Sequence, residues 1–246
     1  MEEFEGVVAV VTGGGRGIGA ATVQLLADKG ASVAVLDRNL SGVPERVLGV
    51  VSDISDDRAV SDGMAKVAEH YGGLDVLINN AGVGAVGDVT QNSDAEWCDV
   101  LNVNVIGAVR ACRAALPLLR RSSKAAIVNV CSAVAFVGVR ERALYSASKG
   151  GLLGLTIAMA ADHVGDGIRV NAVAPGTTET AWIDRLLENA DDKVAARDSL
   201  RARQPLGRFV TRDEVAHAIV SLASPFAGAT TGAVLRVDGG MTTLRV

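Results

Sequence analysis

The stretch that decides the fold reads Thr12-Gly13-Gly14-Gly15-Arg16-Gly17-Ile18-Gly19, between a β-branched run and a helical pattern. The run before it, residues 7–11, is typical of a buried strand, and residues 17–29 read as a helix. Glycines let the main chain approach a pyrophosphate closely, and the free N–H groups at a helix start bind its charge. Strand, glycine turn and helix together predict a dinucleotide-binding turn.

The next apolar run supplies the second half of this prediction. Residues 32–36 read as a strand, and Asp37 follows them directly. A carboxylate at that place can accept both hydroxyls of an adenosine ribose and would repel a 2′-phosphate, which favours NAD over NADP. Arg16 and Arg38 argue the other way, because a guanidinium could bind that phosphate. A solvated loop acid is the alternative role for Asp37.

The alternation of strand and helix continues along the chain, with apolar runs that are continuous, as expected of strands buried on both faces. It predicts an α/β fold, a doubly wound parallel sheet of about seven strands in three α/β/α layers (the Rossmann fold). A TIM barrel is the rival at this length, but it needs eight strands and eight helices. The further strands are expected at 47–51, 76–78, 126–130, 169–173 and 234–237, and the helices at 56–70, 94–121, 144–163 and 212–223.

Two segments interrupt this rhythm. Residues 38–46 are short and contain Asn, Gly and Pro, so we expect a turn in place of a crossover helix. Residues 176–204 contain no strand and a charged helical piece around 183–200, a pattern typical of a substrate loop or lid. Without a repeat or linker, the chain is expected to form one dinucleotide-binding catalytic domain over residues 1–246.

Composition narrows the class of protein. The chain has 246 residues, 49% of them hydrophobic and 21% charged, with a net charge of −4, so wholesale disorder is excluded. Apolar runs stay below the roughly 18 residues of a membrane span, and the acidic start does not resemble a signal peptide. Three widely spaced cysteines argue against a disulfide framework and favour the cytoplasm. Histidine spacing predicts no metal site, and the acidic balance predicts no nucleic-acid partner.

Motifs after the later strands extend the pattern. Together with the spacing Gly13-x-x-x-Gly17-x-Gly19, these motifs resemble those of the short-chain dehydrogenase/reductase (SDR) family. The resemblance covers nearly the whole chain. The matching stretches are Asp53-Ile54, Asn79-Asn80-Ala81-Gly82, Asn104-Val105-Ile106-Gly107, Ser132, Tyr145-Ser146-Ala147-Ser148-Lys149, Asn171-Ala172-Val173-Ala174-Pro175-Gly176 and Val237-Asp238-Gly239-Gly240.

Tyr145 and Lys149 make chemical sense as a pair. They are four residues apart, so a helix places them on one face. A free tyrosine titrates near pH ~10, and a pKa unit corresponds to ~1.4 kcal/mol, so a tyrosine base near neutrality needs roughly 4 kcal/mol of help. The Lys149 ammonium and the positive nicotinamide ring can lower the tyrosine pKa by favouring the phenolate.

The resemblance implies a catalytic tetrad, Asn104, Ser132, Tyr145 and Lys149. Tyr145 is the acid or base, Lys149 also holds the ribose, Ser132 orients the substrate oxygen, and Asn104 holds a water in a proton path. Taken alone, Ser132 could equally be a strand-end cap. Asn104 alone could be a polar group inside a helix that hydrogen-bonds to the backbone, and only the motif register selects Asn104 over Asn102.

The resemblance also implies a set of cofactor contacts around the glycine-rich turn and the later strand ends. Thr178 departs from the family pattern, in which an aliphatic residue is commoner. The implied contacts are Gly13, Arg16, Gly17, Ile18, Gly19, Asp37, Asp53, Ile54, Asn80, Ala81, Gly82, Tyr145, Lys149, Pro175, Gly176, Thr178 and Thr180.

Arginines near the expected pocket suggest an acidic substrate. Arg140 and Arg142 precede the tyrosine, and Trp182 and Arg185 follow the nicotinamide motif. A guanidinium can grip a carboxylate bidentately. Because residues 175–209 resemble the branch acting on hydroxy acids and sugar-derived acids, we expect a small hydroxy acid or polyol-type alcohol, with Arg142, Trp182 and Arg185 as substrate contacts. Surface or subunit ion pairs are the alternative for the arginines.

Assembly and two other functions complete the expectations. In the family, helices corresponding to 94–121 and 144–161 pack between subunits, which implies a homotetramer or homodimer. One alternative function is a 3-oxoacyl-(acyl-carrier-protein) reductase, against which Asp37 argues because such reductases usually prefer NADPH. The other is a non-catalytic NAD-binding regulatory protein, against which the intact tetrad argues.

Overall fold

The computed structural model describes residues 3–180, 183 and 192–245. These residues form a seven-stranded sheet in the order β3-β2-β1-β4-β5-β6-β7, and every neighbouring pair is parallel. The predicted doubly wound sheet is confirmed and the barrel is excluded. The strands are β1 (Val8–Thr12), β2 (Ser32–Asp37), β3 (Leu48–Val51), β4 (Val76–Asn79), β5 (Ala126–Val130), β6 (Arg169–Pro175) and β7 (Val234–Val237).

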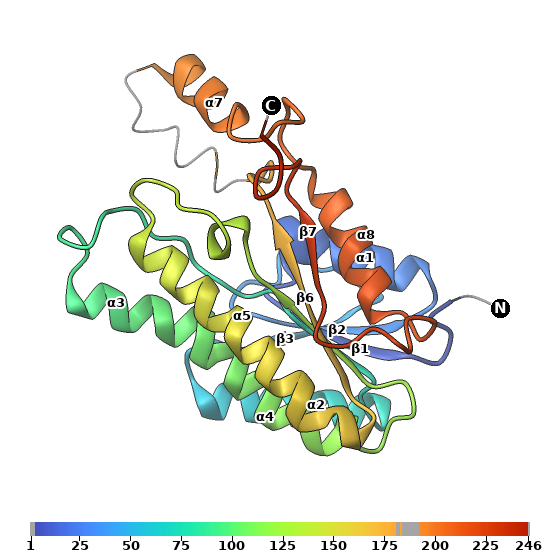
Figure 1. The fold of residues 1–246 in the computed structure, drawn as a ribbon. Coiled ribbons are helices and arrows are strands. Elements are labelled where there is room, and N and C mark those ends of the chain that lie inside the picture. Colours follow the sequence, from blue (N-terminus) through green and yellow to red (C-terminus); the bar gives the residue numbers. More distant parts are fainter. Residues whose placement is uncertain (1–2, 181–182, 184–191, 246) are drawn as a thin grey trace.

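Helices cover both faces of the sheet (Figure 1). On one face lie α1 (Gly17–Asp28) and α8 (Arg212–Ala223), and on the other lie α2 (Asp57–Tyr71), α4 (Gly107–Leu119) and α5 (Ala143–His163). Because side chains alternate along a strand, neighbours in β1 serve different cores. Val11 packs in the core with α1 and α8, whereas Val10 packs in the core with α2 and α4.

The helix expected at 94–121 is interrupted. The chain runs through α3 (Asp94–Leu101), a π-helical turn η1 (Asn102–Ile106) and then α4. Such single turns often occur at functional sites. Here the wider turn carries Asn104, whose side chain points into a buried contact described below. The hydrophobic pattern of residues 94–121 predicted one uninterrupted helix and did not indicate this turn.

The two edge strands correct one expectation. The continuous apolar runs predicted burial on both faces, but Val51 in β3 is 71% exposed and Leu235 in β7 is 41% exposed. An edge strand has a neighbour on one side only, and the β2–β3 connection carries no helix to cover β3. Residues 38–46 form turns, as their composition predicted, and the strand expected from residue 47 begins at Leu48.

The described part of the segment 176–204 includes α7 (Lys193–Arg201), near the chain's C-terminus in Figure 1. Ile183, Leu200 and Phe209 form a small apolar cluster that holds this region together. Trp182 and Arg185, both expected at the substrate, lie outside the described residues. None of the described helices is long and apolar enough to span a bilayer.

Candidate active site

The carboxyl ends of the parallel strands open onto a cleft of about 770 Å³. Ligands in open α/β sheets bind at this edge. The cleft gathers the described residues expected at the cofactor and substrate, with two exceptions, Gly19 and Asn104. Its lining includes Gly13, Arg16, Gly17, Ile18, Asp37, Asp53, Ile54, Asn80, Ala81, Gly82, Ser132, Arg142, Tyr145, Lys149, Pro175, Gly176, Thr178 and Thr180.

The glycine-rich turn fits a pyrophosphate. Gly17 lines the cleft at φ +58°, a conformation that side chains disfavour, and it begins α1. Among the side chains that the structure describes, none caps this helix start, and its first turn carries no acid. The free N–H groups and the positive end of the helix dipole therefore meet the cleft. Gly19 instead packs within the turn, where a Cβ would lie 2.2 Å from the Gly13 carbonyl oxygen.

Carboxylates mark the end of the cleft beyond β2 and β3. Asp37 Oδ2 accepts a hydrogen bond from the Gly15 N–H at 2.9 Å, so this carboxylate is tied to the glycine-rich turn. Arg38 Nη1 lies 3.7 Å from Asp53 Oδ2 in an exposed pair. The Ser55 hydroxyl, more than Arg38, lowers the pKa of Asp53. This end of the cleft therefore combines the carboxylates of Asp37 and Asp53 with the guanidinium group of Arg38.

Asn80 and Thr12 join the ends of β4 and β1. Asn80 Nδ2 donates to the carbonyl oxygens of Thr12 and Gly13 at 3.1 and 2.8 Å. In return, Thr12 Oγ1 accepts from the N–H groups of Asn80 and Ala81, both at 3.1 Å. Asn80 lines the cleft as expected, but its amide holds the turn in place. Sequence reasoning missed Thr12, for which the signal was a lone hydroxyl ending an apolar strand.

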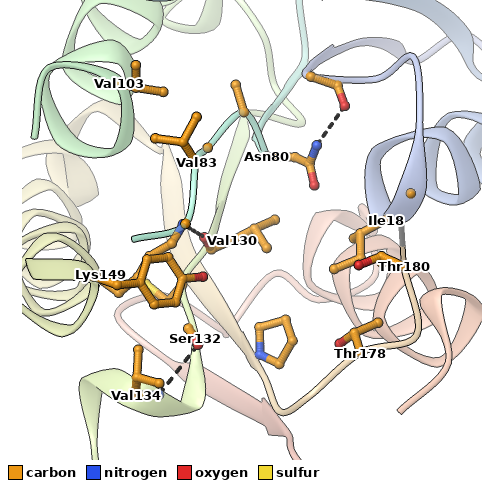
Figure 2. Close-up of a pocket in the computed structure, with 18 of the residues that line it drawn as sticks. Ile18, Asn80, Val83, Val103, Val130, Ser132, Val134, Lys149, Thr178 and Thr180 are labelled. Atoms are coloured by element: carbon orange, nitrogen blue, oxygen red, sulfur yellow. Dashed lines mark hydrogen bonds between the residues drawn. The ribbon is translucent and has the colours of Figure 1, made fainter. Parts of the chain in front are cut away.

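Tyr145, Lys149 and Ser132 meet at the middle of the cleft. Lys149 is 4% exposed; its Nζ donates to the Val130 carbonyl at 2.9 Å and lies 5.9 Å from the centre of the Tyr145 ring. Ser132 follows β5, and its Oγ accepts from the Val134 N–H at 3.4 Å. It therefore caps the short helix η2 (Ala133–Ala135) and also lines the cleft. Figure 2 shows Lys149 and Ser132 across the cleft from Ile18 and Thr180.

Asn104 is buried beside this group and does not line the cleft. Its Oδ1 accepts from the Val83 N–H at 2.8 Å, and its Nδ2 donates to the Val83 carbonyl at 2.9 Å and to Ser148 Oγ at 3.0 Å. Two of these partners are main-chain groups of Val83, and the third is the Ser148 hydroxyl. Asn104 still lies next to the site, because a Cβ on Gly82 would lie 3.2 Å from its Oδ1 and 3.4 Å from Lys149 Nζ.

Cys131 lines the cleft next to Ser132 but is a poor nucleophile. It is 3% exposed, and burial raises the pKa of its thiol to about 11. A neutral thiol of this kind is inert. The described residues contain no group of histidine, cysteine or carboxylate side chains able to hold a metal ion.

The remaining wall of the cleft is basic and apolar. Arg142 stands at the start of α5 and is 7% exposed. Arg203, Leu200 and Val139 also line the cleft, while Arg140 does not. Sequence reasoning missed Arg203 as a site residue. Its signal was a basic residue just after a charged helix, in a segment with no strand to fix its position.

Comparison with known proteins names the family. The family described as enoyl-(acyl carrier protein) reductase matches residues 13–242. The chain belongs to the short-chain dehydrogenase/reductase family. SDR proteins use a nicotinamide cofactor and commonly act on CH–OH groups of small molecules.

Three relatives illustrate the range of SDR activities near this chain. It is 39% identical to cis-4-hydroxycyclohexanecarboxylate dehydrogenase of Sinomonas cyclohexanicum, over 98% of each chain. It is 36% identical to 3-oxoacyl-(acyl-carrier-protein) reductase of Thermotoga maritima, over 97% of this chain and 98% of that one. Its fold matches Thermoplasma acidophilum aldohexose dehydrogenase with a TM-score of 0.93 and 29% identity, covering 100% of this chain and 98% of that one.

Proposed function

We propose that this protein is an NAD-dependent oxidoreductase that interconverts a secondary alcohol and a ketone. The substrate is a small hydroxy acid or sugar-derived molecule. The observation that carries the proposal is the convergence of Tyr145, Lys149 and Ser132 on the cleft that also contains the open start of α1. In the oxidative direction the alcohol loses a hydride and a proton. Bound nicotinamide supplies the hydride acceptor, and the side chains of this chain handle the proton.

The residues of the cleft divide this work between them. Ser132 Oγ donates a hydrogen bond to the substrate oxygen and holds it beside Tyr145. The Tyr145 phenolate takes the hydroxyl proton, and the nearby Lys149 ammonium favours the phenolate by its charge. Lys149 also binds the ribose next to the nicotinamide. In reduction the same groups act in reverse, and Tyr145 returns its proton to the oxygen.

The two ends of the cofactor fit different parts of the chain. The turn from Gly13 to Gly17 and the start of α1 hold the pyrophosphate, while Asp37 accepts hydrogen bonds from the adenosine ribose. Pro175, Gly176, Thr178 and Thr180 line the nicotinamide end. Thr178 Oγ1 donates to the Gly176 carbonyl at 3.1 Å, so this hydroxyl stabilises its own turn.

A homotetramer or homodimer is the proposed assembly. Its support is the exposed apolar surface at Ile106 in η1 and Ile157 in α5, 43% and 54% exposed. Light scattering on the purified protein tests it, and a monomer at micromolar concentration would contradict it.

The cellular compartment is a separate proposal. The described cysteines are free thiols, which supports a reducing cytoplasmic compartment.

A 3-oxoacyl-(acyl-carrier-protein) reductase is the second candidate function, favoured by the similarity to the Thermotoga maritima reductase. Asp37 separates the two candidates, because a carboxylate at the adenosine ribose repels the 2′-phosphate of NADPH. Titration with NADH and with NADPH decides between them. Tighter binding of NADPH would favour the acyl-carrier-protein substrate.

Substitution of Tyr145 by Phe tests the catalytic proposal. We expect the Tyr145→Phe variant to lose roughly 10²–10⁴-fold in turnover, the usual contribution of general acid–base catalysis, and to keep NADH binding, measured by fluorescence. The matched control is Tyr71→Phe. Tyr71 lies outside the cleft lining, and its hydroxyl donates to the Val33 carbonyl at 3.1 Å. Unchanged turnover of Tyr145→Phe on an alcohol and hydroxy-acid panel would refute the assignment of Tyr145 as the acid or base, whereas no turnover by the wild type on that panel would favour a cofactor-binding protein without catalysis.

A further inference from the structure

A single guanidinium nitrogen joins the π-helical turn η1 to the loop that follows β3. Arg110 lies in α4, and its Nη1 donates to the Asn102 carbonyl oxygen in η1 at 3.3 Å. The same nitrogen donates to the Ile54 carbonyl oxygen at 3.4 Å. The Asn102 oxygen also accepts the Gly107 N–H, which closes the π-turn. Arg110 therefore holds the main chain at Ile54 against the turn where α4 begins.

Gly107 lets the same loop lie close to α4. Its φ of −58° is ordinary for a helix, so the backbone conformation does not require glycine here. The surroundings do, because a Cβ at this position would lie 2.7 Å from Ile54 Cγ1 and 3.3 Å from both Ile54 Cγ2 and the Ile54 carbonyl oxygen. The three nearest atoms all belong to Ile54, and a close-packed interior does not accommodate such an overlap. The missing side chain at residue 107 therefore makes the room that Ile54 occupies.

Ile54 stands at the end of the cleft that the proposed function assigns to the adenosine. It follows Ser52 by two residues, and the Ser52 N–H donates to the Asp37 carbonyl oxygen at 3.0 Å. Ile54 lines the cleft and is half-buried, and its side chain also packs against the core formed with α2 and α4. An apolar side chain on a pocket wall suits the flat face of a base. Gly107 and Arg110, which do not line the cleft, contact Ile54 from behind this wall.

We propose that Gly107 and Arg110 are positioning residues for adenine binding. They fix the place of Ile54, and Ile54 forms the apolar wall against which the adenine ring of the dinucleotide packs. Gly107 acts by leaving room for the Ile54 side chain, and Arg110 acts by holding the Ile54 carbonyl group. The inference rests on the proposed function, which places the adenosine ribose at Asp37.

Substitution of Gly107 by Ala adds one methyl group toward Ile54. We expect the dissociation constant for ADP-ribose, measured by titration calorimetry, to rise about fivefold or more, because overpacking forces the neighbouring side chain to move. A variant that merely folded less well would show fewer binding sites per chain and an unchanged dissociation constant. The matched control Gly73→Ala adds the same group where nothing lies within 4 Å, and it should bind ADP-ribose as wild type does.

A double-mutant cycle tests whether the added methyl group acts through Ile54. Ile54→Ala removes both side-chain carbon atoms that this group would meet. In that background, Gly107→Ala should change the dissociation constant for ADP-ribose by less than about twofold, because effects of residues in contact are not additive. An unchanged constant in the single Gly107→Ala variant, or an equal further loss in the Ile54→Ala background, would overturn the role of Gly107.

Arg110→Met tests the second positioning residue, because it removes the donor and keeps an apolar stem. We expect the dissociation constant for ADP-ribose to rise about threefold, in line with the loss of a hydrogen bond. The matched control is Arg113→Met, which removes an exposed arginine of the same helix that bonds to Asp57 Oδ1 at 3.1 Å, and it should keep the wild-type constant. An Arg110→Met constant equal to that of wild type would overturn the role of Arg110.

The same titrations separate this inference from the proposed function. Failure of the wild type to bind ADP-ribose would refute the dinucleotide site itself, and the positioning residues with it. Binding by the wild type with unchanged constants in Gly107→Ala and Arg110→Met would refute the positioning residues alone. Since the titrations need no turnover, neither result depends on the identity of the alcohol substrate.

Discussion

Asn80 Nδ2 lies 2.8 Å from the carbonyl oxygen of Gly13 and so fastens the glycine-rich turn to the end of β4. The same nitrogen reaches the Thr12 carbonyl at 3.1 Å, so one amide satisfies an acceptor at the end of β1 and another in the turn that follows it. A pyrophosphate site made of main-chain N–H groups works only if those groups stay in position. We therefore propose that Asn80 serves the cofactor through the backbone as well as from the cleft wall.

The first prediction removes this donor. Asn80→Ala leaves two carbonyl groups without the amide, and we expect a loss of about 1–3 kcal/mol in the free energy of unfolding. The melting temperature should fall by about 2–10 °C, and the dissociation constant for NADH should rise several-fold. Asn80→Asp should be at least as damaging, because a carboxylate would face the two carbonyl oxygens. NADH affinity equal to wild type in both variants would contradict the positioning role.

The second prediction concerns cofactor choice at Asp37. Asp37→Asn keeps an oxygen that can accept from the Gly15 N–H, now at 2.9 Å, but removes the charge. We expect NADH to bind about tenfold more weakly, since hydrogen bonds to a charged group contribute about 1.5–3 kcal/mol. NADPH should bind more tightly than to wild type, because the repulsion is gone and Arg38 remains nearby. Titrations of both cofactors measure this, and a fall in affinity for both would show that Asp37 mainly holds the turn.

The sheet could be predicted from the sequence because its signals are local. Residues 126–130 read as a strand from five consecutive residues and are observed as Ala126–Val130, and the helix expected at 212–223 is observed as Arg212–Ala223. The π-turn at Asn102–Ile106 and the exposure of β3 depend on contacts between distant segments, which a local pattern does not contain. Which strands are covered by helices, and which strands lie at the edges of the sheet, therefore became known only from the structure.

The same distinction applies to the site. Tyr145 and Lys149 were predictable because their spacing of four residues on one helix fixes their relative positions. Asp37 was predictable because it lies at the end of a strand. Arg203 was not predictable, since it lies 61 residues after Arg142 and only the folded chain brings both to one cleft. Asn104 was found by its motif, yet its partners Val83 and Ser148 became visible only in the fold.

The third prediction uses the start of α8. Glu214 bonds to Arg208 and to the Thr211 N–H, and these contacts, the Arg208 bond first, lower its pKa from 4.5 to about 2. A carboxyl whose pKa is lowered on folding adds stability that is fully present above pH about 4.5 and lost as the pH falls towards 2. Glu214→Gln should therefore lower the urea midpoint at pH 7, and the difference from wild type should shrink below pH 4. The control is Glu45→Gln, an exposed carboxylate. If the difference in urea midpoint between Glu214→Gln and wild type did not change with pH, the loss of stability would be due to the altered helix cap alone and not to the charge of Glu214.

The last prediction separates two roles for Asn104. Its amide satisfies both main-chain groups of Val83 and reaches the buried Ser148 Oγ, so Asn104→Ala removes three hydrogen bonds, and we expect a loss of about 1–3 kcal/mol in the free energy of unfolding. We expect the melting temperature to fall by about 5–10 °C, together with turnover, because Val83 lines the cleft. Asn102→Ala is the matched control in the same π-turn, and it should retain both properties. If Asn104→Ala kept its melting temperature and lost turnover only, the side chain would take part in proton transfer directly, and its hydrogen bonds to Val83 would be incidental to the fold.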